Sequence, residues 1–133
     1  MGEEDDKRVA LVSEDAMTVK LINYAFANYK ISIDPFLTVE KLGNMEEDEE
    51  DFPSAIIYDC PSRILDESLL CRPLKDCGLQ ENTPVLIIST LKKNCASCPE
   101  YEAGRCAHIQ KPFKIKDMTA KLIALVEYQK SSI

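Results

Sequence analysis

Short apolar segments recur along the chain and predict five β-strands. The clearest lies in FPSAIIYDCP, residues 52–61, where Ala55 to Tyr58 form an apolar run without polar alternation. Such a run is typical of a strand buried on both faces, as in a parallel sheet covered by helices. Further strands are predicted at 9–12, at 85–88, at 107–110 and in the alternating residues Ile31, Ile33 and Phe36.

The segments between these strands include two longer stretches with helical spacing. Residues 16–29 and 117–128 place apolar side chains three or four positions apart, which predicts helices with one stripe facing a sheet. The stripe of the first helix is Met17, Leu21, Ala25 and Tyr29, and that of the second is Met118, Leu122, Leu125 and Val126.

Three shorter helices are predicted from their boundary residues. Pro35 is expected to close the second strand, and Thr38 to cap a helix over 39–45. A helix over 64–72 should end or kink at Pro73, because proline lacks an amide donor. A short fourth helix is predicted to begin at Pro99, between the fourth and fifth strands. Strands and helices therefore alternate five times. Right-handed crossovers then predict an α/β fold, with a parallel sheet between two helical layers.

Length and composition indicate a single soluble domain over residues 1–133, since 45% of the residues are hydrophobic and 29% are charged. No apolar run approaches the roughly 20 residues that cross a bilayer. Residues 1–6 form an acidic tail where a signal peptide would be basic. We therefore expect a cytoplasmic protein without a membrane partner.

The overall charge is acidic. A net charge of −7 and a pI near 4.8, without a basic stripe, argue against direct binding to nucleic acid. The run EEDEED at 46–51 predicts a solvated acidic loop, because packed carboxylates repel one another. Weak binding of a divalent cation is the alternative for this loop.

Polar residues end several of the predicted strands, where ligands bind in open α/β sheets. Ser13, Glu14 and Asp15 follow the first strand, Asp59 ends the third, Ser89 ends the fourth, the stretch EAG occupies 102–104, and Lys111 precedes Pro112 and Phe113. In order and spacing, these features resemble the receiver domains of two-component response regulators, and the resemblance covers nearly the whole chain. It implies a flavodoxin-like (βα)5 fold with strand order 2-1-3-4-5.

The resemblance also implies a phosphoacceptor site. Asp59 would accept a phosphoryl group from a histidine kinase or phosphotransfer protein, in a phosphorelay of signal transduction. Glu14, Asp59 and the backbone carbonyl of Pro61 would hold Mg²⁺, while Ser89 and Lys111 would contact phosphoryl oxygens. The physical reason is that a carboxylate attacking a phosphoryl group needs its negative charge offset. Taken singly, each of these residues is better interpreted as an ordinary polar residue at a strand end, and only the whole set favours the phosphoacceptor site.

Several positions depart from the family pattern. Ser13 and Glu14 stand where two adjacent acids are usual, so metal affinity should fall. Ser13 and Asp15 are further candidate ligands, although register places Asp15 one residue too far along. Thr90 replaces a small residue and should narrow access to Asp59, and Arg63 replaces a proline of the following loop.

His108 occupies the aromatic switch position of the family, three residues before the lysine. With Ser89, it would change conformation on phosphorylation, and its charge would titrate near neutrality. An exposed strand residue without a switching role is the alternative.

The six cysteines are not explained by the resemblance. The spacing C-x2-C-x7-C-x-H, formed by Cys95, Cys98, Cys106 and His108, would suit a tetrahedral Zn²⁺ site. The alternative is a metal-free set of small apolar residues. The remaining thiols, Cys60, Cys71 and Cys77, are interpreted as core or near-core residues.

Two functions remain open from the sequence. The first is a stand-alone phosphoacceptor domain, not an enzyme beyond its own phosphorylation, that switches a downstream protein through the surface of the fourth helix and fifth strand. The second is a pseudo-receiver, an interaction module independent of phosphorylation, with a cysteine-based metal or redox site.

Overall fold

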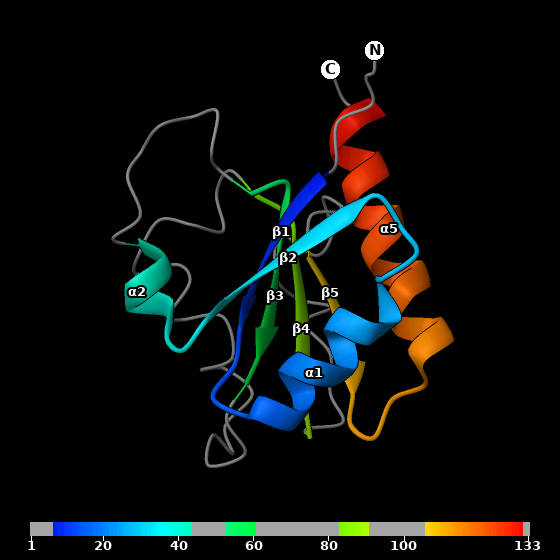
Figure 1. Ribbon diagram of the computed structural model, residues 1–133. Coiled ribbons are helices and arrows are strands. Elements are labelled where there is room, and N and C mark those ends of the chain that lie inside the picture. Colours follow the sequence, from blue (N-terminus) through cyan, green and yellow to red (C-terminus); the bar gives the residue numbers. More distant parts are fainter. Residues whose placement is uncertain (1–6, 44–52, 61–82, 91–105, 132–133) are drawn as a thin grey trace.

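A five-stranded parallel sheet forms the centre of the protein (Figure 1). The computed structural model describes residues 7–43, 53–60, 83–90 and 106–131. The strands lie in the order β2-β1-β3-β4-β5, which confirms the predicted flavodoxin-like topology. The strands are β1 (Lys7–Val12), β2 (Ile31–Phe36), β3 (Ala55–Asp59), β4 (Val85–Ser89) and β5 (Cys106–Gln110). The helices described are α1 (Ala16–Ala25), α2 (Val39–Gly43) and α5 (Ile115–Ser131).

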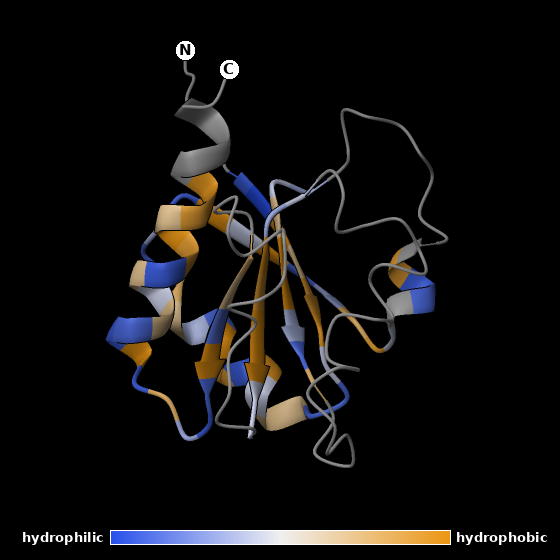
Figure 2. Ribbon diagram, turned by 180° about the vertical axis from the view of Figure 1, so that it is seen from behind, coloured by the Kyte–Doolittle hydropathy of each residue, from blue (hydrophilic) through white to orange (hydrophobic). Residues whose placement is uncertain are grey.

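The main core lies between the sheet and two helices, α1 and α5, which cover the same face (Figure 1). All five residues of β3 and of β4 are buried, as their unbroken apolar runs predicted. Figure 2 shows these strands as a continuous hydrophobic centre between more polar outer segments. The core residues are Val9, Leu11, Ile22, Phe26, Ala55, Ile57, Leu86, Ile88, Ile109, Met118, Leu122, Leu125 and Val126.

The opposite face of the sheet is buried as well. The alternate residues Ala10, Ile56 and Ile87 are almost fully inaccessible but lie outside that core, and Leu42 of α2 is buried too. Side chains of successive strand residues point to opposite faces, so both faces of the central strands are covered. This double burial leaves the strand ends as the places where polar groups of the central strands gather.

The predicted stripe of α1 was wrong for Met17, Leu21 and Tyr29, whereas Ala25 does pack against the core. Met17 is 69% exposed and Leu21 is 39% exposed, while Ile22 and Phe26 are buried in the core. A spacing of four residues advances by about 400°, so a row of such residues winds slowly around the helix. Val19, Ile22 and Phe26 alternate spacings of three and four and stay on one side. The helix also ends at Ala25, earlier than predicted.

Pro35 does not close the second strand, as was predicted, but lies within it and aligns with Leu11. The reason is that β2 is an edge strand, where a missing amide donor costs little. The Thr38 cap is confirmed, since the Lys41 amide donates to Thr38 Oγ1 at 3.2 Å.

The apolar stripe of α5 is confirmed, because Met118, Leu122, Leu125 and Val126 are all buried. No helix in the described part of the chain has both the length and the apolar character to span a membrane. Several predicted segments lie outside the described residues: the tail 1–6, the loop 46–51, the helix 64–72 with Pro73, and the stretch 102–104.

Candidate functional site

Asp59 is a buried carboxylate at the carboxyl edge of the sheet. It is the last residue of β3, the central strand, and only 5% of its surface is exposed. β1 and β4 flank β3, so residues that end these strands surround it. Burying an ionised carboxylate is costly unless charged or polar groups pair with it. The contacts of its two oxygens therefore define the site.

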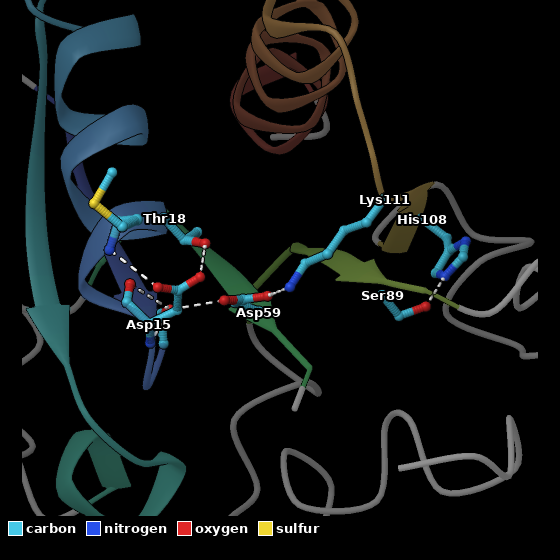
Figure 3. A network of polar contacts seen from close by, with 8 residues as sticks. Asp15, Thr18, Asp59, Ser89, His108 and Lys111 are labelled. Carbon is cyan, nitrogen blue, oxygen red and sulfur yellow. Dashed lines mark hydrogen bonds and ion pairs between the residues drawn. The ribbon is translucent and has the colours of Figure 1, made fainter. Parts of the chain in front are cut away.

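Two residues from outside β3 meet the carboxylate of Asp59 (Figure 3). Ser13 Oγ donates a hydrogen bond to Asp59 Oδ2 at 2.7 Å, and Lys111 Nζ lies 2.5 Å from Oδ1. The ammonium forms an ion pair with Oδ1 without the angular geometry of a hydrogen bond. The backbone amide of Lys111 donates to the carbonyl of Ser89 at 2.7 Å, which fixes the start of its side chain beside β4.

Two hydrogen bonds to backbone groups fix the position of Ser13. Its amide donates to the carbonyl of Phe36 at 3.0 Å, which extends the pairing of β1 with β2 by one residue. Its hydroxyl oxygen accepts a hydrogen bond from the Asp15 amide at 3.1 Å. The buried hydroxyl is therefore directed by the turn into α1 toward Asp59.

Asp15 caps the first turn of α1. Its Oδ1 accepts from the Met17 amide at 3.0 Å, and its Oδ2 accepts from the Thr18 hydroxyl at 2.9 Å. These two bonds, with Thr18 as the larger contribution, hold the pKa of the Asp15 carboxyl below its usual range. Asp15 was a candidate metal ligand, but both of its oxygens are engaged with α1.

Ser89 and His108 form a second polar pair at the edge. Ser89 Oγ lies 2.7 Å from His108 Nε2, in a hydrogen bond between β4 and β5 (Figure 3). Ser89 is buried, whereas His108 is half-buried. The bond brings together the two residues that were predicted to form the switch.

The other positions that the sequence singled out near the site are Glu14, Pro61, Arg63 and Thr90. Glu14 is exposed, next to Ser13, and Pro61 and Arg63 lie outside the described part. Thr90 is exposed, and its carbonyl accepts a hydrogen bond from the Gln110 amide group at 3.3 Å. Within the described ranges, no three His, Cys, Asp or Glu side chains gather into a metal cluster.

Cysteine positions are described only in part. Cys60 and Cys106 are buried, in agreement with the interpretation of Cys60 as a core thiol. Cys71, Cys77, Cys95 and Cys98 lie outside the described residues. The zinc site of Cys95, Cys98, Cys106 and His108 therefore stays a prediction.

Sequence reasoning missed two roles. Asp15 directly precedes a helix, and this N-cap signal was present in the sequence. The bond from Ser13 to Asp59 had a weaker signal, namely that both residues follow neighbouring strands of the predicted sheet. Ser13 was interpreted as the loss of an acid and as a further candidate metal ligand, whereas its hydroxyl directly contacts the carboxylate of Asp59.

Comparisons with solved structures show which known proteins share this fold. No protein-family model matches the sequence, and no curated protein matches it. Among solved structures, the receiver domain protein (CheY-like) from Methanospirillum hungatei JF-1 has a TM-score of 0.67 and 18% identity, covering 96% of this chain and 98% of that one. The receiver domain of Francisella response regulator 1452 has a TM-score of 0.67 and 20% identity, covering 92% and 98%.

A longer protein, the response regulator DrrB of Thermotoga maritima, also matches with a TM-score of 0.65 and 21% identity. The match covers 92% of this chain but 54% of that protein, so this chain spans about half its length. At these identities, structural similarity establishes the fold. Together with the strand order, it shows that this chain has the fold of response regulator receiver domains.

Proposed function

We propose that this chain is a receiver-type signalling domain in which Asp59 accepts a phosphoryl group. The observation that supports this best is the buried carboxylate of Asp59 in direct contact with the Lys111 ammonium at the carboxyl edge of the sheet. The proposed donor is the phosphohistidine of a histidine kinase or phosphotransfer protein in a two-component system. The proposed location, the cytoplasm, rests on the sequence alone.

The proposed chemistry is one phosphoryl transfer. An oxygen of Asp59 attacks phosphorus, a P–O bond forms, and the P–N bond of the phosphohistidine breaks with its electron pair passing to the imidazole nitrogen. Lys111 is positioned to offset the charge of the phosphoryl oxygens. The chain acts as a regulatory phosphoacceptor that catalyses only its own modification.

Mg²⁺ fits the chemistry of the donors in part. Carboxylate oxygens are the ligands that Mg²⁺ prefers. Asp59 supplies them at the end of β3, and Glu14 directly follows Ser13, which contacts Asp59. Asp59, Glu14 and the carbonyl of Pro61 are the residues that would hold the ion. When bound, it would neutralise charge on the incoming phosphoryl group.

The output of the domain is proposed to pass through Ser89 and His108. Ser89 would exchange its bond with His108 for a bond to a phosphoryl oxygen, and the freed ring would change its position at the surface of β5. A downstream protein, and not nucleic acid, would bind there together with the predicted fourth helix, which lies outside the described residues.

Intact-mass measurement after incubation with acetyl phosphate and Mg²⁺ tests the acceptor. The protein should gain one phosphoryl group, and Asp59→Asn should gain none. Asp34→Asn is a matched control, because Asp34 is an exposed strand residue paired with Arg8. A modification that persists in Asp59→Asn would disprove the assignment.

A pseudo-receiver is the second candidate, and the same network supports it. Asp59 is already paired with Ser13 and Lys111, so these contacts also fit a purely structural role for the buried carboxylate. In that case neither small donors nor phosphotransfer proteins would modify the chain, and Asp59→Asn would bind the downstream protein as well as the unmodified chain does. The cysteine-based metal or redox site belongs to this candidate.

A further inference from the structure

We propose that Ser13 holds the Asp59 carboxylate by a hydrogen bond that competes with a divalent cation, so that the chain keeps its acid site ordered without metal. The proposal rests on the proposed function in treating Asp59 as the acceptor. Its test measures cation binding, however, and is independent of phosphorylation.

The direction of the Ser13 hydrogen follows from the local contacts. The hydroxyl oxygen accepts the Asp15 amide hydrogen at 3.1 Å, so its own hydrogen is available for donation. Asp59 Oδ2 lies at 2.7 Å and the Asp15 carbonyl at 3.4 Å, which makes Asp59 the preferred acceptor. The amide therefore orients and polarises the hydroxyl toward the carboxylate.

Burial strengthens this bond. Ser13 and Asp59 are both almost inaccessible to solvent, so water does not compete for Oδ2. A hydrogen bond to an ionised acceptor is stronger than one between neutral groups, and low dielectric increases the difference. A cation that binds at Oδ2 has to replace this bond.

The net charge of the three contacting side chains also disfavours cation binding. Asp59 and Lys111 carry opposite charges in contact, and Ser13 is neutral, so the three side chains sum to zero. Of the two acids that follow Ser13 in the chain, Asp15 is engaged as the cap of α1 and Glu14 is exposed to solvent. A site with little net negative charge attracts Mg²⁺ weakly, because affinity rises with the number of charged ligands.

Calorimetric titration with Mg²⁺ tests the competition. Ser13→Asp should bind Mg²⁺ about tenfold more tightly than the unmodified chain, because it adds a carboxylate and removes the competing donor. Ser32→Asp is the matched control, since Ser32 is exposed on β2 and the added charge lies away from Asp59. It should bind like the unmodified chain. Equal affinities of Ser13→Asp and the unmodified chain would overturn the proposal.

Ser13→Ala gives a second comparison that does not depend on the folding of Ser13→Asp. Removing the hydroxyl should raise Mg²⁺ affinity about threefold or more, because no hydrogen then competes for Oδ2. Unchanged or weaker affinity would contradict the competition. A chain that shows the expected order of affinities but never accepts phosphoryl would leave this inference standing and reject the proposed function.

Discussion

Ser13 and Ser89 are two buried serines at the same edge of the sheet whose hydroxyls have different partners. Ser13 follows β1 and donates to Asp59, whereas Ser89 ends β4 and bonds His108. Both flanking strands are direct neighbours of β3, so distance along the sheet does not explain the difference. The difference is explained by the alternation of side chains between the two faces of the sheet.

Residues on the two faces of the sheet alternate along each strand. Leu11 and Ile57 face the core under α1 and α5, and Ser13 and Asp59 lie two positions beyond them, on the same side. Ile88 also faces that core, so Ser89 is directed to the opposite side, where it meets His108. The two serines therefore lie on different sides of the sheet. Ser13 holds the Asp59 carboxylate, whereas Ser89 bonds His108 and is the serine proposed to change its partner.

Lys111→Met should have the largest effect, because it leaves the buried Asp59 carboxylate without a countercharge. We expect a loss of about 2 to 4 kcal/mol in the free energy of unfolding at pH 7, measured by urea denaturation. This expected loss is smaller than for a fully buried ion pair, because the Lys111 side chain is 26% exposed. In an Asp59→Asn background the same substitution should cost much less, and an equal cost in both backgrounds would contradict the ion pair.

Comparison of Ser13→Ala with Ser89→Ala tests the difference between the two serines directly. Ser13→Ala removes a donor from a buried charged oxygen and should cost about 1.5 to 3 kcal/mol. Ser89→Ala should cost about 1 kcal/mol, because half-buried His108 can bond water instead. Urea denaturation of both variants measures the gap. A larger loss for Ser89→Ala would mean that the two hydroxyls have been assigned to the wrong roles.

His108→Phe should remove the hydrogen bond between Ser89 and His108 while keeping a ring on β5. If Ser89 then bonds a phosphoryl oxygen, the phosphorylated fraction at fixed acetyl phosphate should rise about fivefold, as expected for one hydrogen bond of about 1 kcal/mol. Intact-mass spectrometry measures this fraction below saturation. Adding His108→Phe to Ser89→Ala should give no such gain, and a gain there would show that the ring acts independently of Ser89.

Asp15→Ala should have the smallest effect, a few degrees in melting temperature at pH 7, because it removes an exposed N-cap. The folded-state pKa of Asp15 lies below its ordinary value of 3.8, so the stabilising contribution is present above that value and is lost as pH falls through the folded-state pKa. The difference in melting temperature between Asp15→Ala and the unmodified chain should therefore become smaller at acidic pH. Asp15→Asn keeps an uncharged cap and should show less of this pH dependence in thermal melts.

The sequence by itself determined the fold and its strand ends. The apolar runs at 55–58 and 85–88 are short, rich in β-branched residues and bounded by turn residues, which favours buried strands. Their alternation with helices favours a parallel, doubly covered sheet. Asp59 and Ser89 were predictable as edge residues because they directly end such runs. These features depend on local pattern and on general rules of chain connection.

Tertiary structure alone decided which side chains meet. The stripe of α1 depended on how the helix is rotated against the sheet, so Met17 became exposed and Ile22 buried. Ser13 and Asp59 are 46 residues apart, and their contact requires the parallel register of β1 with β3 as well as the same side of the pleat. No local pattern encodes that register and rotamer, because both follow from packing the whole sheet.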